Sequence, residues 1–330
     1  MNIGEIAKMA GVSKAAVSRY FNQGYISEEK REAIRKVVEQ TGYRPSVQAQ
    51  TLRTKKTKMI GVILPKIDSA SMGSVVSGIL AVLNENGYQL LLADTQNNSK
   101  KELEYLKWFD DKQVDGVILA ATVFTSGHKK ILKSMNVPVV IVGQRMSGCH
   151  CVYHDDYHSI YDMTTLLLEK GRKNLAYIGV LKQDKAVGAE RYQGFCDAVL
   201  EGGLEQLKEQ TVISGFLIED GYEAMMKLME RYNNLDGVVC ATDEIAIGAM
   251  QYLKSLRVDI PTQIMVTGHG DSVLAKVASP TLTTVHFSYE ESGMEAARML
   301  LKLLDQEEFA VREIKLGYHL VKQQTTQICE

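Results

Sequence analysis

The 330-residue sequence has no apolar run of the roughly 20 residues that a helix needs to cross a bilayer. Its opening, Met1-Asn2-Ile3-Gly4-Glu5, predicts the start of a capped polar helix and not a signal peptide. We therefore expect a cytoplasmic protein with no membrane partner. The five cysteines are an odd number, and most fall on apolar segments typical of buried thiols. This pattern predicts a reducing compartment and no disulfides.

Motifs that carry catalysis or hold a cofactor are also missing. The sequence has no GxGxxG, no GxxxxGK[ST] phosphate loop and no GxSxG nucleophile turn. Cys149-His150-Cys151 and His154-Asp155-Asp156 suggest a metal site, but three adjacent side chains do not easily converge on one ion, and CxxC and HExxH are absent. We predict no enzymatic activity, no metal and no cofactor.

The first sixty residues instead predict a small helical DNA-binding domain. A helix over about 3–10 ends at Gly11, and Ser13 is placed to cap a second helix over about 14–21. Two short helices joined across a glycine turn form a helix-turn-helix. Ser27 is placed to cap a third helix, and three helices of this size can share one core.

The outward face of the second helix carries short or hydrogen-bonding side chains that suit a groove of DNA. An arginine matches O6 and N7 of guanine, and an alanine can contact the methyl group of thymine. Small polar side chains more often hold phosphates. The residues predicted to read bases are Lys14, Ala15 and Arg19, and those predicted to position phosphates are Ser13, Ser18 and Asn22.

Charge divides the chain at the same place. Residues 1–58 hold 12 Lys and Arg against 5 Asp and Glu, a net charge of +7, whereas the rest of the chain has a net charge of −9. A basic segment on an acidic body fits phosphate contact at one end only. A charged helical face can also be merely solvated, but the helix-turn-helix spacing favours DNA binding.

The remaining residues, about 270 in number, are enough for two medium domains. Near-continuous apolar runs alternate with amphipathic stretches, as expected for buried parallel strands separated by helices. The runs lie at 60–64, 88–93, 116–120 and 139–143, and again at 175–180, 237–241 and 264–268. They predict an α/β core with two doubly wound parallel sheets.

Three short motifs carry a resemblance to a known family. The stretch from Ala7 to Arg19, the run Gly42-Tyr43-Arg44-Pro45, and Ala49 with Leu52 resemble the signature of the lactose/galactose (LacI/GalR) repressor family of bacterial transcription factors. The resemblance covers essentially the whole chain. Glu5, Ala16 and Ser46 differ from the residues usual in the family.

The resemblance implies three segments: a helix-turn-helix headpiece over 1–45, a hinge over 46–58, and a two-lobed core like the periplasmic-binding-protein fold over 59–330. The core is expected to bind the effector and to dimerise. Because the chain of this fold crosses between lobes, the lobes are not contiguous in sequence. We expect one lobe over about 59–158 plus 288–316, and the other over about 159–287 plus 317–330.

The hinge is too short to be a stable helix alone, since isolated helices need about 12 to 15 residues in water. We expect it to fold when two hinges pack over a minor groove. There Leu52 corresponds to the family's wedging leucine, with Ala49 beside it and Arg53 on a phosphate. A plain flexible linker is the alternative. The expected assembly is a homodimer on a near-palindromic operator, because the chain carries no leucine heptads for a tetramer.

Four residues that lie beyond apparent strands match effector-binding positions of the family: Gln144, Arg191, Phe216 and Asp243. A carboxylate can accept two hydrogen bonds from neighbouring sugar hydroxyls, and an aromatic ring can cover an apolar face. For each residue alone the signal is weak, because an aspartate that caps a helix or an arginine in a surface ion pair is the commoner explanation. Together they predict a ligand site in the cleft between strand ends.

Runs such as Leu64-Pro65-Lys66-Ile67-Asp68-Ser69 are most similar to repressors of sucrose and trehalose operons. This similarity implies a sugar or sugar-phosphate effector, such as sucrose, trehalose or a 6-phosphate, that releases the repressor from DNA. Lys66 could meet a phosphate or could equally be a solvated lysine. In Gly268-His269-Gly270-Asp271, where relatives usually have Gly-aromatic-Asp-Asp, His269 could donate to the ligand or could serve only as a structural histidine. The alternatives are a regulator whose ligand promotes DNA binding and a two-lobed solute-binding protein.

Overall fold

The computed structural model describes residues 1–22, 24–43, 56–111, 114–120, 122–204, 210–305 and 310–327. The chain forms two compact units, Met1–Thr57 and Lys58–Glu330. Across these described ranges, no helix combines the length and the apolar character required to span a membrane.

The described part of the first unit contains three short helices, α1 (Ile3–Met9), α2 (Lys14–Phe21) and α3 (Glu28–Thr41). Asn2 and Glu5 form the predicted capping box of α1. Ser13 caps α2 as predicted, because its hydroxyl accepts the amide hydrogen of Ala16 at 3.2 Å. Ser27 precedes α3 as predicted, but its side chain makes no capping hydrogen bond. Ile6, Val17 and Ile34 are fully buried between the helices and form their shared core.

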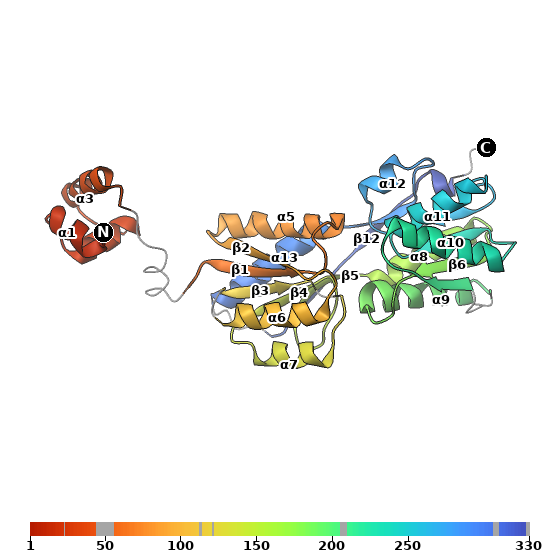
Figure 1. Ribbon diagram of the computed structural model, residues 1–330, viewed down its shortest axis with the longest axis horizontal. Helices are drawn as coiled ribbons and strands as arrows, with labels where there is room; N and C mark the ends of the chain where they lie inside the picture. Colours follow the sequence, from red (N-terminus) through yellow and green to blue (C-terminus); the bar gives the residue numbers. More distant parts are fainter. Residues whose placement is uncertain are drawn as a thin grey trace. The chain divides into compact units, whose positions relative to one another are not determined.

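The second unit begins with a six-stranded parallel sheet in the order β11-β5-β4-β3-β1-β2. Helices α5 and α13 pack on one face of this sheet, and α6 and α7 pack on the other (Figure 1). Because both faces are covered, the inner strands are apolar along their whole length. We call this layered body lobe 1. Its elements are β1 (Met59–Leu64), α5 (Ala70–Glu85), β2 (Gln89–Asp94), α6 (Ser99–Asp110), β3 (Gly116–Leu119), α7 (Ser126–Ser134), β4 (Val139–Val142), β5 (His150–His154), α13 (Tyr289–Leu304) and β11 (Glu313–Leu316).

Lobe 2 is built on a four-stranded parallel sheet in the order β7-β6-β8-β9. Its helices pack in the pairs α8 with α9 and α10 with α11 around one large core. Its elements are α8 (Asp156–Glu169), β6 (Leu175–Gly179), the π-helix η1 (Lys185–Glu190), α9 (Arg191–Glu201), β7 (Thr211–Ile213), α10 (Ile218–Arg231), β8 (Gly237–Cys240), α11 (Asp243–Ser255), β9 (Met265–Thr267) and α12 (Val273–Val277).

The chain passes between the lobes at three places. These lie between β5 and α8, between β10 (Thr284–Phe287) and α13, and between β11 and β12 (Tyr318–Val321), which is followed by the 3-10 helix η3 (Gln324–Thr326). Strands β10 and β12 pair antiparallel beside α8 of lobe 2. The three crossings place the carboxyl end of β5 and the segment after β10 at the boundary between the lobes.

Every apolar run predicted as a strand overlaps one to within a residue or two at either end, which confirms the two doubly wound parallel sheets. Strands β5, β7, β10 and β12 were not predicted. Strand β5 carries two histidines, β7 has only three residues, and β10 and β12 form a two-stranded antiparallel pair. None of them has the long apolar run that marks a strand buried on both faces.

Candidate DNA-binding surface and ligand cleft

Helix α2 presents the predicted contact residues to solvent. Its inward side is formed by the buried residues Ala16 and Val17, which pack in the headpiece core. The side chains that remain exposed are Ser13, Lys14, Ala15, Arg19 and Asn22, and Ser18 is partly exposed. The helix therefore offers one uninterrupted polar and basic face, as a helix that enters a groove requires. The hinge residues Ala49, Leu52 and Arg53 lie outside the described residues, so their roles stay predictions.

In lobe 2, the guanidinium of Arg191 lies buried where β8 and α9 meet. Arg191 is only 5 % exposed. Its Nε and Nη2 both lie 2.7 Å from Oδ1 of Asp156, and its Nη1 donates to the carbonyl oxygen of Ala241. The guanidinium also lies 5.4 Å from the ring centre of Phe287. Three segments distant in sequence thus converge on one buried cation.

Asp243, the first residue of α11, is completely buried. Its carboxylate accepts hydrogen bonds from the backbone amide of Ser272 at 2.7 Å and from the hydroxyl of Thr284. Burial raises the pKa of Asp243, and these hydrogen bonds oppose the rise. The carboxylate therefore joins the ends of β8, α12 and β10.

His269 follows β9 and is 3 % exposed. Its Nε2 lies 2.8 Å from the hydroxyl of Ser159 on α8, and its backbone oxygen accepts the amide hydrogen of Asp243 at 3.1 Å. Burial, together with the charge of Arg191, lowers the pKa of His269 well below its usual value, so the ring is neutral at physiological pH. We call Asp156, Arg191, Asp243 and His269 the lobe 2 cluster.

An aromatic wall adjoins this cluster and was not predicted. The ring of His154, at the end of β5, lies 4.7 Å from that of Phe287 and 5.2 Å from that of Tyr289. Burial lowers the pKa of His154 and raises the pKa of Tyr289 to about 12, so both are neutral. The sequence contains no signal for this wall, because more than a hundred residues separate His154 from the other two rings.

The other predicted effector residues lie away from the lobe 2 cluster. Gln144 follows β4 in lobe 1, where its amide donates to the carbonyl oxygen of Thr122 at 2.8 Å. Lys66 follows β1, and its ammonium lies 3.2 Å from Asp68. Burial raises the pKa of Glu244 in lobe 2, and the positive charge of Lys66 partly offsets that rise. Phe216 is 41 % exposed in the turn between β7 and α10.

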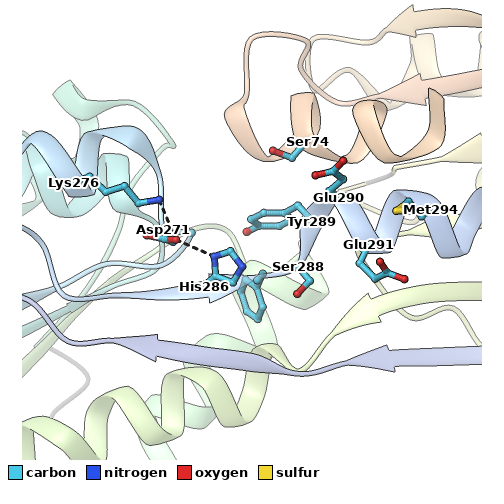
Figure 2. Close-up of a pocket in the computed structure, with 11 residues that line it drawn as sticks. Ser74, Asp271, Lys276, His286, Ser288, Tyr289, Glu290, Glu291 and Met294 are labelled. Atoms are coloured by element: carbon cyan, nitrogen blue, oxygen red, sulfur yellow. Dashed lines mark hydrogen bonds and ion pairs between the residues drawn. The ribbon is translucent and has the colours of Figure 1, made fainter. Parts of the chain in front are cut away.

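A cavity of about 470 Å³ lies between the lobes, beside the crossing from β10 to α13. Figure 2 shows Lys276 and His286 directed at Asp271, with which they pair at 3.2 and 2.9 Å. Ser74 and Glu290 of lobe 1 lie across the cavity from these residues. None of the six predicted effector residues lines this cavity. Because Phe287 and Tyr289 line it and also form the aromatic wall, cavity and wall share these two side chains.

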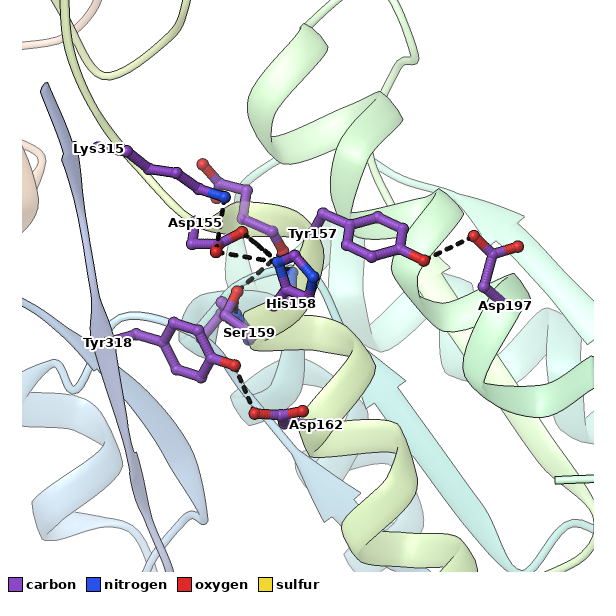
Figure 3. Close-up of polar contacts among 10 residues, drawn as sticks. Asp155, Tyr157, His158, Ser159, Asp162, Asp197, Lys315 and Tyr318 are labelled. Carbon is purple, nitrogen blue, oxygen red and sulfur yellow. Dashed lines mark hydrogen bonds and ion pairs between the residues drawn. The ribbon is translucent and has the colours of Figure 1, made fainter. Parts of the chain in front are cut away.

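Polar contacts also join the lobes at the other crossings (Figure 3). The carboxylate of Asp155 accepts from Lys315 of β11 at 2.7 Å and from Nδ1 of His158 at 2.9 Å. Burial acts to raise the pKa of Asp155, but the hydrogen bonds from Lys315 and His158 outweigh it, and the pKa is lowered. The hydroxyl of Tyr318 on β12 donates to Asp162 on α8. These contacts fix the first half of α8 against the crossing strands.

Comparison with known proteins agrees with this architecture. Residues 2–46 match the bacterial regulatory proteins of the lacI family, and residues 164–326 match a periplasmic binding protein-like domain. The chain is 32 % identical over 305 residues to the sucrose operon repressor of Staphylococcus xylosus. The aligned region covers 92 % of this chain and 93 % of the relative.

Solved structures give the same result. A complex of the transcriptional regulator CelR with cellobiose superposes with a TM-score of 0.76 at 26 % identity, covering 98 % of this chain and 99 % of that one. The lac repressor dimer bound to operator reaches a TM-score of 0.90 at 19 % identity over 99 % of both chains, a likeness of fold. With its helix-turn-helix headpiece and two-lobed core, the chain belongs to the lacI family of bacterial regulatory proteins and is a transcriptional repressor, not an enzyme.

Proposed function

We propose that this repressor controls a carbohydrate-utilisation operon and leaves its operator when a sugar or sugar phosphate binds between the lobes. A disaccharide such as sucrose or trehalose, or its 6-phosphate, is the proposed effector. The similarity to a sucrose operon repressor and to a regulator solved with cellobiose supports a sugar of this size.

The observation that carries the proposal is the lobe 2 cluster beside its aromatic wall. Sugars present hydroxyl groups on their edges and C–H groups on their ring faces. Arg191 and Asp156 offer charged hydrogen-bonding groups, and Phe287 and Tyr289 offer aromatic surface next to them.

The six predicted effector residues take different parts in this proposal. Arg191 and His269 lie at the cluster, and Asp243 orders the segments around it through Ser272 and Thr284. Lys66 and Gln144 approach the ligand from lobe 1, and Phe216 covers it from the turn after β7. Ligand binding draws the lobes together and changes the distance between the two hinges of a homodimer. Because the coupling is reciprocal, operator DNA weakens sugar binding by the same factor.

At the DNA end, we propose that the headpiece of residues 1–45 and the hinge of residues 46–58 bind a near-palindromic operator as a homodimer, which the core of residues 59–330 holds together. The exposed face of α2 supports base reading by Lys14, Ala15 and Arg19. Ser13, Ser18 and Asn22 are proposed to hold phosphates, and Ala49, Leu52 and Arg53 to act in the minor groove.

Fluorescence anisotropy of labelled upstream DNA tests both the proposed operator binding and the proposed response to the effector. Sucrose, trehalose and their 6-phosphates are added separately to the protein–DNA complex at fixed salt, because salt alone changes the affinity. Release of the DNA by one of these compounds is the expected result. Tighter binding in the presence of a small molecule would instead favour the regulator whose ligand promotes DNA binding. The absence of any specific DNA binding would overturn the proposal.

A matched pair of variants separates base reading from general attraction. Arg19→Ala removes a positive charge from the exposed face of α2, and Arg31→Ala removes one from α3 of the same headpiece. We expect Arg19→Ala to weaken operator binding by about tenfold or more and to reduce the preference for operator over random DNA. Arg31→Ala should leave that preference unchanged. Equal effects of the two variants would contradict the assignment of α2 as the reading helix.

A further inference from the structure

We propose that the effector is an uncharged carbohydrate and not a sugar phosphate, because Asp156 and Asp68 already neutralise the two cations proposed above to meet it, Arg191 and Lys66. The inference rests on the proposed function, since it concerns the chemistry of the ligand in the same cleft. It makes Asp68 and Asp156 determinants of specificity against phosphate esters.

Arg191 is poorly suited to clamp a phosphate, because Asp156 already balances its charge and at most two of its five N–H hydrogens remain. A guanidinium that clamps phosphate combines two free donors with an unbalanced positive charge. Here Nε and Nη2 are both held by Oδ1 of Asp156 at 2.7 Å, and Nη1 is held by the carbonyl oxygen of Ala241. Both charged side chains are at most 6 % exposed. A phosphate that displaced Asp156 would leave a buried carboxylate without its cation and beside a dianion, and both effects oppose binding.

Lys66 is similarly occupied. Its ammonium lies 3.2 Å from Asp68 in lobe 1, and it interacts electrostatically with Glu244 of lobe 2. A phosphate approaching Lys66 therefore meets the carboxylate of Asp68 together with one cation. Because the Lys66 and Asp68 side chains are 42 % and 66 % exposed, water weakens the pair. Asp68 can thus be neutralised by mutation without disturbing buried structure.

The helix starts of lobe 2 give a third, independent argument. A helix N-terminus binds phosphate through its free amide groups and its positive dipole end. In lobe 2 the first turns or caps of the longer helical segments are filled by acidic side chains: Asp155 and Asp156 in α8, Asp184 at the start of η1, which continues into α9, Glu219 and Asp220 in α10, and Asp243 and Glu244 in α11. These carboxylates occupy the favourable end of each dipole and repel a second anion.

An uncharged sugar meets no such repulsion. Its hydroxyl groups can donate to the paired carboxylates and accept from the remaining guanidinium hydrogens without separating an ion pair. Its ring face can lie on the aromatic wall of His154, Phe287 and Tyr289, whose side chains are neutral near pH 7. The described residues of the cleft thus pair both of these cations with carboxylates and offer many hydrogen-bonding groups.

Isothermal titration of the full chain with sucrose, trehalose and cellobiose, each beside its own 6-phosphate, tests the inference. We expect an uncharged sugar to bind at least about tenfold more tightly than its phosphate. Asp68→Asn should improve phosphate binding about two- to fivefold and leave the parent sugar nearly unchanged. Glu295→Gln is the charge-matched control, because it also breaks a partly exposed ion pair, with Arg298 on α13. That control should change neither affinity.

The outcomes separate this inference from the function on which it rests. A phosphate that binds more tightly than its parent sugar, or an Asp68→Asn variant that behaves like the control, overturns the inference while a sugar-responsive repressor remains. If none of the six compounds binds while specific operator binding persists, the proposed sugar function itself fails.

Discussion

The two lobes have the same layered architecture but place their charges differently. At the carboxyl ends of its strands, lobe 2 buries ionisable side chains, each at most 6 % exposed: Asp156, Asp184, Arg191, Asp243 and His269. Lobe 1 also buries Glu102, His128 and His154, but of its two predicted effector residues Lys66 lies in water, paired with Asp68, and the buried Gln144 is uncharged. Buried charges need fixed partners, so lobe 2 is the preorganised half of the cleft and lobe 1 the half that can adapt.

The largest expected effect comes from removing one cation from each lobe. Arg191→Ala leaves Asp156 buried without its partner, and we expect a loss of about 3 to 5 kcal/mol in the free energy of unfolding. Lys66→Ala breaks an exposed pair and should cost less than about 1 kcal/mol. Urea unfolding followed by circular dichroism measures both. Similar losses in the two variants would contradict the contrast between a preorganised and an adaptable lobe.

The next effect depends on pH and concerns Asp184, which caps η1 and is 6 % exposed. Burial raises the pKa of Asp184 to about 6, above its ordinary value of 3.8, although the amide hydrogen of Val187 and the charge of Arg191 oppose this. Between these two values the folded protein binds the proton more strongly than the unfolded chain. Below pH 4 the side chain of Asp184 is protonated in both states and its burial costs no stability. As the pH rises, the unfolded chain ionises first and the folded protein loses stability, and this loss reaches its full size above pH 6.

Asp184→Asn keeps an oxygen that can accept the amide hydrogen of Val187 but cannot ionise. We expect its stability relative to the parent protein to rise by up to about 3 kcal/mol between pH 4 and pH 7.5. Urea midpoints at several pH values measure the change. In the exposed pair of lobe 1, Asp68→Asn provides the matched control, whose difference from the parent should vary little with pH. A flat profile for Asp184→Asn would show that its burial carries no electrostatic cost.

Sequence patterns were sufficient to predict the layered sheets of the two lobes, but not the contacts within the lobe 2 cluster. Arg191, Asp243 and His269 could be predicted because each follows an apolar run or a family motif. The pairing of Arg191 with Asp156, and the wall formed by His154, Phe287 and Tyr289, depend on two crossings between the lobes. Contacts between segments so far apart in the sequence leave no local periodicity. The strands that carry these residues or lead into them, β5 and β10, also lack the apolar runs that identify strands.

The smallest expected effect tests a feature that the lobes share. Gly78 lets α5 approach α13 in lobe 1, because an added Cβ would lie 1.9 Å from the carbonyl oxygen of Glu290. Gly248 does the same in lobe 2, where a Cβ on α11 would lie 1.9 Å from the carbonyl oxygen of Ile218. Backbone atoms cannot give way without moving a helix, so alanine at either position should cost about 1 to 3 kcal/mol. Gly73, also on α5, has open space around it.

Gly73→Ala is therefore the matched control, and it should stabilise the protein by about 0.5 to 1 kcal/mol through helix propensity. Thermal unfolding of the three variants checks these signs. Equal losses in Gly78→Ala and Gly248→Ala would mean that close helix contact is a common requirement of both lobes, so that their difference lies in the charges at the cleft. A loss confined to Gly248→Ala would extend the difference to the packing itself, because the helices of lobe 1 would then be able to move apart at little cost.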